Sequence, residues 1–390
     1  MVNHLGNWRN GELGNFITLK RGFDLPQQKR EDGQVPIFSS SGITGTHSTA
    51  MVNAPGVITG RYGTIGEVFY AAEDFWPLNT TLFVEDFHGN DAKFIYYFLK
   101  TLEWSKFTSA SAVPGINRNT VHKETVSLPD IETQRRIAST LSMLDEKIKT
   151  NTEINDNLQQ QAQALFKKWF IDNPDAISWK EGTFSNLIEK TISGDWGKDS
   201  PSGNNTEMVY CIRGADIPEV RAGNKGKMPT RYILPKNYAA KQLVDGDIVV
   251  EISGGSPTQS TGRAAAVSDA LLARYDKGMV CTNFCKALKP RAGYSMYVYY
   301  YWQYLYDRDI FFSYENGTTG IKNLDINGFI ETEPIVIAPE DLVEKFDAVC
   351  QTVFSKIYAN GMENEQLALV RDTILPKLMS GEIDVSAVQL

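Results

Sequence analysis

The chain has 390 residues, of which 42% are hydrophobic and 11% aromatic. This is enough for two or three domains of ordinary size with well-filled cores. The sequence has no apolar run of about 18 residues, the length a membrane span requires. It also does not begin with a basic stretch followed by an apolar one, which a secretory signal requires. We therefore expect neither, and a cytoplasmic location.

The formal net charge of −8 is unusual for a protein that binds nucleic acid, but the charge is unevenly distributed. Lys and Arg number 11 against 12 Asp and Glu over residues 1–128, and 18 against 18 over 179–337. Seven of the eight excess negative charges lie in 129–178 and 338–390. Because affinity for phosphates comes from Lys and Arg, we expect these two shorter segments to face protein partners.

Common catalytic motifs are missing from the sequence. It has no GxxxxGK[ST] phosphate loop, no GxSxG elbow, no HExxH, no GxGxxG after a strand, and no Asn/Asp-Pro-Pro-Tyr/Phe as in amino-methyltransferases. The four cysteines and four histidines lack metal-ligand spacing, and Cys281 and Cys285 are best explained as core thiols. We expect no catalytic residue, no metal and no cofactor on this chain.

An internal repeat organises the chain. Between about 131 and 170, positions alternate in steps of four and three, the spacing of a heptad seam: Ile137, Leu141, Leu144, Ile148, Asn151, Asn155, Leu158, Ala162, Leu165 and Trp169. Adding 209 gives a second seam: Phe346, Cys350, Val353, Ile357, Asn360, Asn364, Leu367, Arg371, Ile374 and Leu378. Any single amphipathic helix shows such spacing, but two that share phase and a central Asn pair indicate a repeat.

If the two helices lie antiparallel, Asn151 faces Asn364 and Asn155 faces Asn360. Buried asparagines in a seam cost stability but fix the register and orientation of the helices. We therefore predict that these four residues set the register of the helix pair.

The second helix is the less regular of the two. Gly361 should weaken its middle, Pro376 should kink its last turns, and Gly381 should end it. We expect domains at 1–129 and 173–338, a first spacer helix at 130–172, and a second with a C-terminal tail at 339–390.

The two domains correspond more loosely. The segments 8–13 and 179–184 are alike, as are Leu78-Asn79-Thr80 and Thr282-Asn283-Phe284, and the segments 114–117 and 319–323. Short β-branched or aromatic runs alternate with Gly, Ser, Asn and Pro turns, which is typical of an irregular sheet. One aromatic helix per domain follows, and its rings are expected in the core. The expected fold class is α+β, with two domains alternating with two long helices that pair as an antiparallel coiled coil.

Polar, glycine-rich loops with embedded cations remain as the candidate functional feature. Such loops bring N–H groups and hydroxyls close to phosphates, while Arg, Asn and Gln read base edges. Glycine-rich turns occur in every β protein, so no single loop is decisive. The candidate DNA-binding residues in the first domain are Lys20, Arg21, Ser40, Ser41, Thr44, Arg61, Tyr62, Thr64, Ser109, Ser111 and Arg118. Those in the second are Arg213, Lys225, Lys227, Ser256, Thr258, Gln259, Arg263, Thr318 and Lys322.

With these features the chain resembles the specificity subunit of a type I restriction-modification system along essentially its whole length. The resemblance rests on the two domain-plus-helix halves and on four segments: Thr59-Gly60-Arg61-Tyr62-Gly63-Thr64-Ile65-Gly66, Leu78-Asn79-Thr80-Thr81-Leu82, residues 128–138, and the closing residues 374–383. The second domain departs from the pattern, because it offers Thr261-Gly262-Arg263 in place of the Gly-Arg-Tyr-Gly segment.

The resemblance implies two target-recognition domains that each read one half of a split, asymmetric DNA site, held apart by the helix pair. It also implies two modification subunits that bind S-adenosylmethionine and methylate adenine, and restriction subunits that use ATP and Mg²⁺. Two alternatives stay open: a binding module that serves a stand-alone methyltransferase or mimics DNA, and an enzyme whose active site lies in the glycine-rich loops.

Overall fold

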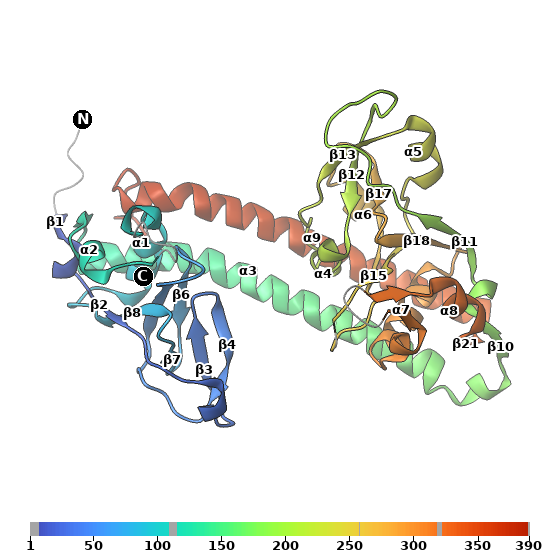
Figure 1. Ribbon diagram of the computed structural model, residues 1–390, viewed down its shortest axis with the longest axis horizontal. Helices are drawn as coiled ribbons and strands as arrows, with labels where there is room; N and C mark the ends of the chain where they lie inside the picture. The colour runs from blue at the N-terminus through green and yellow to red at the C-terminus, as the bar shows by residue number, and fades with distance from the viewer. Residues whose placement is uncertain (1–7, 109–114, 257, 318–321, 389–390) are drawn as a thin grey trace. The chain divides into compact units, whose positions relative to one another are not determined.

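The computed structural model describes residues 8–108, 115–256, 258–317 and 322–388 (Figure 1). Within these residues the fold is mixed α+β, which confirms the expected class. The chain divides into two compact units, residues 1–147 with 367–390 and residues 148–366, so each long helix contributes to both units. Among the described residues, no helix combines the length and the apolar character needed to cross a membrane.

The first unit is built on a four-stranded sheet in the order β2-β8-β5-β6, a three-stranded sheet in the order β4-β3-β7, and the pair β1-β9. Its strands are β1 (Arg9–Glu12), β2 (Thr18–Arg21), β3 (Val35–Ser39), β4 (Gly42–His47), β5 (Gly56–Gly60), β6 (Val68–Ala71), β7 (Trp76–Pro77), β8 (Thr81–Asp86) and β9 (Thr125–Leu128).

The second unit contains a four-stranded sheet in the order β11-β18-β14-β16, a three-stranded sheet β13-β12-β17, the pair β10-β21, and an additional small sheet β15-β20-β19. Its strands are β10 (Lys180–Thr183), β11 (Ile188–Ser193), β12 (Glu207–Ile212), β13 (Thr230–Ile233), β14 (Ile248–Glu251), β15 (Ser253–Gly254), β16 (Ala264–Ala266), β17 (Met279–Cys281), β18 (Cys285–Pro290), β19 (Glu315–Asn316), β20 (Lys322–Leu324) and β21 (Pro334–Ile337).

The strand order of the second unit repeats that of the first, sheet by sheet. In both units one pair is parallel, β3 with β7 and β12 with β17. A Cβ on Gly22, after β2, would lie 2.2 Å from the Leu78 carbonyl oxygen, and a Cβ on Gly194, after β11, would lie 1.9 Å from that of Thr282. Leu78-Asn79-Thr80 and Thr282-Asn283-Phe284 therefore occupy the same place in the two units, which confirms this part of the predicted repeat.

The helices begin and end where local side chains satisfy their free backbone groups. The Asp130 carboxylate accepts a hydrogen bond from the Thr133 amide (2.9 Å) at the start of α3, and Gly381 adopts a left-handed φ of 74° just after α9. The helices are α1 (Ala92–Lys100), α2 (Arg118–His122), α3 (Ile131–Phe166, continued by a π-helical turn Lys167–Ile171), α4 (Ile217–Arg221), α5 (Pro235–Lys241), α6 (Asp269–Leu272), α7 (Ser295–Tyr306), α8 (Ile326–Thr332) and α9 (Glu340–Met379).

In the second unit α3 and α9 run antiparallel, and their buried asparagines meet. The Asn151 amide donates to Asn364 Oδ1 at 2.9 Å, and the Asn360 amide donates to Asn155 Oδ1 at 2.8 Å. These are the two pairs that the antiparallel seams predict. In the first unit the same helices place Ile137, Leu141, Leu375 and Leu378 in the core.

Gly361 has a different role from the one expected. A Cβ at this position would lie 1.9 Å from the Gly223 carbonyl oxygen, so glycine lets the segment after α4 approach α9 closely. The helix runs without a break through Gly361 and Pro376 to Met379. The glycine therefore serves packing in the second unit and does not interrupt the helix.

Each unit has its own core. The second is dominated by aromatic side chains of α7, including Tyr297, Tyr300 and Trp302, packed against Phe166 of α3 and Phe346 of α9. All four cysteines are buried and free. The aromatic helices and the cysteines thus belong to the cores, as the sequence predicted.

Candidate nucleic-acid interface

In the first unit, the described candidate residues lie at strand ends and turns. Lys20 and Arg21 end β2, Ser40 and Ser41 form the turn between β3 and β4, Thr44 lies on β4, the segment from Arg61 to Thr64 follows β5, and Arg118 starts α2. Ser109 and Ser111 lie outside the described residues.

The turn after β5 is tightly built. A Cβ on Gly60 would lie 1.9 Å from the Thr64 carbonyl oxygen, and Gly63 adopts a left-handed φ of 77°. The amides of Arg61 and Tyr62 both donate to the Thr80 carbonyl, at 2.8 and 3.2 Å. The backbone under Arg61 is therefore fixed by these bonds.

Arg61 is the cation of this turn. Its guanidinium lies 4.6 Å from the centre of the Tyr62 ring, and it forms no ion pair within the part of the chain that the structure describes. Lys20, by contrast, pairs with Glu85, and Arg21 lies 3.5 Å from Asp24. Arg61 thus presents a charged group on a fixed backbone, the arrangement that base or phosphate recognition requires.

In the second unit, three candidate cations are held by buried carboxylates. Arg213 pairs with Asp216 at 2.9 Å, Arg263 with Glu251 at 2.6 Å, and Lys322 with Glu315 at 2.8 Å. The side chains of the three carboxylates are 3%, 7% and 6% exposed, so each needs its cation. Asp216 is three residues from Arg213, whereas Glu251 and Glu315 lie on strands other than the segments that carry their cations, so the sequence did not reveal those two partners.

Arg263 is held at two points. Its Nε and Nη2 donate to the two oxygens of Glu251 at 2.8 and 2.6 Å, and this pairing raises the pKa of the guanidinium above its ordinary value. Arg263 directly precedes β16, where Ala264 pairs with Val250, whereas Arg61 directly follows β5. The expectation that Arg263 is the counterpart of Arg61 is therefore wrong, since the two occupy different strands of the repeat.

The remaining candidates of the second unit lie on exposed loops. Lys225 stacks at 4.7 Å on the Tyr275 ring, and Lys227 is exposed. Ser256, Thr258 and Gln259 form a turn in which the Ser256 amide donates to the Gln259 carbonyl at 2.8 Å. Thr318 lies outside the described residues.

Reasoning from the sequence missed a pocket in the second unit. It has a volume of 500 Å³ and lies where β12, β14 and β17 end, with Trp196 and Phe284 among its lining residues. These two rings are 38% and 59% exposed, which is unusual for large aromatic side chains. Of the residues that line it, the sequence analysis had proposed Arg213 for DNA binding, and the likeness of Thr282-Asn283-Phe284 to Leu78-Asn79-Thr80 was a second signal that pointed to this place.

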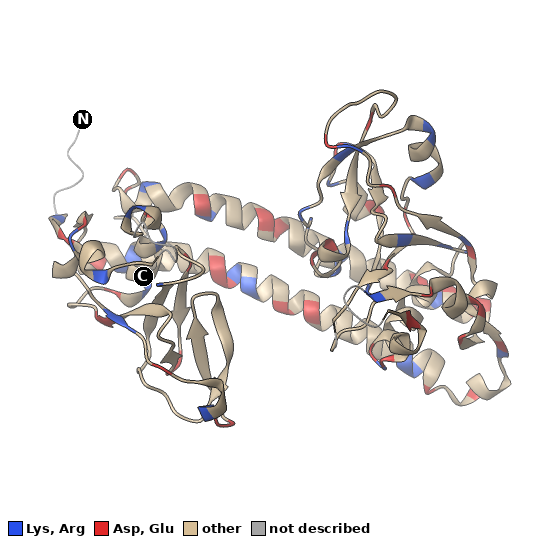
Figure 2. Cartoon of the chain, in the orientation of Figure 1, with Lys and Arg blue, Asp and Glu red and all other residues tan. Residues whose placement is uncertain are grey.

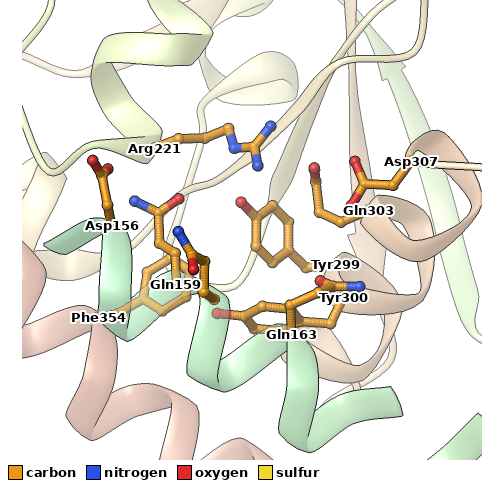
Figure 3. Close-up of a pocket in the computed structure, with 10 residues that line it drawn as sticks. Asp156, Gln159, Gln163, Arg221, Tyr299, Tyr300, Gln303, Asp307 and Phe354 are labelled. Carbon is orange, nitrogen blue, oxygen red and sulfur yellow. The ribbon is translucent and has the colours of Figure 1, made fainter. Parts of the chain in front are cut away.

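A second pocket of the same unit is polar and has a volume of 250 Å³. Figure 3 shows Gln159 and Gln163 of α3 facing Tyr299 and Gln303 of α7 across it, with Arg221 above. The buried Gln303 Oε1 has no hydrogen-bond partner among the described atoms, while its amide donates to the Ala264 carbonyl at 3.3 Å. Such a pocket suits a polar group, either water or a partner's side chain.

Acidic side chains recur along α3 and α9 (Figure 2). No cluster of three or more His, Cys, Asp and Glu that suits a metal ion occurs in the described part of the chain. The asparagine pairs aside, the candidate residues of each unit gather on loops at strand ends.

Comparisons with known proteins show which proteins this chain is similar to. A family model described as the type I restriction modification DNA specificity domain matches residues 6–160. An alignment of 321 positions, which includes 76% of this chain and 70% of the relative, shows 26% identity to the type I restriction enzyme MjaIX specificity subunit of Methanocaldococcus jannaschii. A second alignment of 355 positions, which includes 73% of this chain and 75% of the relative, shows 24% identity to the type I restriction enzyme HindI specificity subunit of Haemophilus influenzae.

The fold has a solved counterpart. The crystal structure of the S subunit of a type I restriction-modification system from M. genitalium matches 97% of both chains with a TM-score of 0.58 and 17% sequence identity. At this identity the match supports the fold alone. Together with the sequence matches it confirms the resemblance on which the sequence expectations rest.

Proposed function

From its similarity to the specificity subunits of type I restriction-modification systems, we propose that this chain recognises DNA sequence and that each of its two recognition domains reads one half of a bipartite, asymmetric DNA site. The helix pair sets the spacing between the half-sites and docks the modification and restriction subunits. The chain itself is non-catalytic and carries no cofactor. S-adenosylmethionine, ATP and Mg²⁺ bind to the partner subunits.

The observation that carries this proposal is a repeated framework with different loops. The two units share the order of three sheets, yet Ser40 and Ser41 of the first unit stand where the second has Gly214 and Ala215. The register of the parallel strands gives this equivalence, because Phe38 pairs with Pro77 and Ile212 with Cys281. Two domains with the same sheet framework but different loop side chains are suited to recognise two half-sites of different sequence.

The long helices support a spacing role. With 36 and 40 residues, α3 and α9 are about 54 and 60 Å long at 1.5 Å per residue. Half-sites on one face of B-DNA lie roughly 34 Å apart, a distance that such helices span. The buried asparagine pairs oppose sliding of one helix along the other.

Exposed apolar residues on the helices support partner docking. In the first unit Met143 of α3 and Leu369 and Val370 of α9 are 55%, 68% and 48% exposed. In the second unit Ile154 and Met362 are 39% and 46% exposed. Apolar groups on an otherwise polar helix face are typical of the central part of protein interfaces.

A domain exchange tests the proposal. Residues 1–128 are replaced by the corresponding domain of another specificity subunit, and adenine methylation is mapped by single-molecule sequencing in cells with the cognate methyltransferase. We expect a split, asymmetric motif of which only one half changes. A change in both halves, or in neither, contradicts the modular reading. Methylation that persists after deletion of the whole chain favours a binding module without this enzyme as its partner.

A further inference from the structure

The pocket at the ends of β12, β14 and β17 is held open by the backbone around it. A Cβ on Gly214 would lie 2.4 Å from Glu251 Oε1, so only glycine leaves that carboxylate in place. Glu251 is in turn fixed by both donors of Arg263. The base of the pocket is thus an ion pair that is satisfied before any ligand arrives.

Both exposed rings are carried by a fixed backbone. The Phe284 carbonyl accepts hydrogen bonds from the amides of Ile252 and Ser253, at 2.9 and 3.3 Å. The Trp196 carbonyl accepts one from Arg231 Nε at 2.7 Å, and the Arg231 guanidinium lies 4.1 Å from the Trp196 ring. Two exposed rings on a backbone held in this way are preorganised for an apolar contact.

A free amide stands beside the rings. Asn283 is exposed, and its side chain has no hydrogen-bond partner among the residues that the structure describes. In the first unit the equivalent Asn79 donates to Asp24. Gly22 and Gly194 are equivalent positions, so Trp196 of the second unit stands where the first unit has Asp24. The second unit therefore has an aromatic ring at this place and lacks the carboxylate that would accept a hydrogen bond from the Asn283 amide.

This combination matches one edge of one base pair. In the major groove, adenine offers N7 and N6 to a bidentate Asn or Gln, and its partner thymine presents a methyl group that prefers apolar contacts. Guanine with cytosine offers neither the same donor pattern nor a methyl group. Stacking alone, which accepts any base, would not need the free amide.

We propose that this pocket reads an A·T pair in the second half of the DNA site, with Asn283 on the adenine edge and Phe284 and Trp196 against the thymine methyl group. This inference rests on the proposed function and adds the residues that set specificity. In the first unit, Asp24 and Thr80 occupy the places of the two rings, so that domain reads its half-site by other contacts.

Base analogues test the contacts one at a time. The chain, assembled with its methyltransferase subunit, is bound to duplexes in which single thymines are replaced by uracil or single adenines by 7-deaza-adenine. At one pair of the second half-site we expect uracil to weaken binding about fourfold, the effect of one buried methyl group, and 7-deaza-adenine to weaken it about tenfold. Phe284→Ala should abolish the response to uracil only, and Asn283→Ala the response to 7-deaza-adenine only.

Controls separate the possible failures. Ile177, which is 95% exposed and does not line the pocket, serves as Ile177→Ala, which should retain both responses. Phe284→Leu keeps an apolar group and should retain part of the response to uracil if Phe284→Ala folds poorly. If the wild-type complex reads no split site, the proposed function fails.

If the wild-type complex reads both half-sites but no second-half position responds to uracil, the pocket does not contact a thymine methyl group and the inference is overturned. It is also overturned if Phe284→Ala leaves base discrimination intact and instead loses the methyltransferase subunit. That outcome would assign the pocket to a protein partner.

Discussion

Asn151 of α3 donates a hydrogen bond of 2.9 Å to Asn364 of α9, although 213 positions separate them in the sequence. Their side chains are buried, with residue exposures of 1% and 8%. The bond between the two amides forms only if the asparagines stand opposite each other, so a shift of either helix by one residue would break it. The pair therefore links the register of the helices to their stability.

We expect the double substitution Asn151→Leu with Asn364→Leu to raise the free energy of unfolding by about 1 kcal/mol, because it replaces two buried polar groups by an apolar contact. Asn151→Leu alone should lower it by about 1–3 kcal/mol, since Asn364 Oδ1 then loses its donor while the Asn364 amide keeps only the Thr152 hydroxyl at 3.4 Å. Thermal and denaturant unfolding of the three proteins measure both effects. Asn157→Leu, on the exposed side of α3, should change little, and a double variant less stable than either single one would contradict this role.

Arg61 and Arg263 should respond differently to the same substitution. Arg61→Ala removes a side chain without an ion pair in the described structure, so folding should be unchanged within about 0.5 kcal/mol, while DNA binding weakens by about 1–3 kcal/mol. Arg263→Ala leaves the buried Glu251 unpaired and should cost about 3 kcal/mol of stability. Melting curves and DNA titrations of the assembled complex measure the two losses.

The double variant Arg263→Ala with Glu251→Gln separates an effect on folding from an effect on DNA binding. Removal of the unpaired carboxylate should restore most of the lost stability. If DNA binding recovers together with stability, Arg263 acts through the fold. If Arg61→Ala lowers the stability as much as Arg263→Ala does, the claim that Arg61 has no stabilising ion pair is wrong.

The long helices and their pairing could be predicted from the sequence, because periodicity is a local signal that extends over many turns. The starts of α3 and α9, at Ile131 and Glu340, fall within one residue of the expected 130 and 339. The asparagine pairs followed from the same spacing. The correspondence of Asn79 with Asn283 was also detectable, because the short segments Leu78-Asn79-Thr80 and Thr282-Asn283-Phe284 are alike.

Strand order and ion pairing depend on contacts distant in sequence and could not be read from it. Glu251 lies 12 positions from Arg263 and across a strand pair, so nothing in the local sequence shows that the arginine is held. Gly361 is a second example, because the residue that it approaches is Gly223, which is distant in the sequence. From the sequence alone, a glycine within a helix indicates only a less stable helix.

Leu369 should be a contact point for the methyltransferase subunit. Leu369→Asp places a charge on a 68% exposed site and should leave the fold intact while reducing co-purification of the methyltransferase subunit at least tenfold, since a buried unpaired charge costs an interface several kcal/mol. Gln28→Asp adds the same charge on an exposed polar site outside the long helices and should have no effect. Equal recovery of the partner with both variants would place the docking surface elsewhere.

The stability of the first unit should fall in mildly acidic solution because of His122. Its Nε2 accepts a hydrogen bond of 2.8 Å from the Leu19 amide, which requires the neutral ring. Burial, with the nearby Arg118 and His88, lowers the pKa of His122 below its ordinary value.

The unfolded chain therefore takes up a proton at a higher pH than the folded one. The stabilisation that His122 provides is complete above the unfolded pKa of about 6.5 and is lost as the pH falls through the lower folded pKa. Unfolding of the wild type and of His122→Gln, which retains an acceptor but does not titrate, should be compared at pH 7.5 and 5.0. We expect the wild type to lose about 1 kcal/mol more than the variant over this interval. Identical losses in the two proteins would show that another group carries the pH dependence.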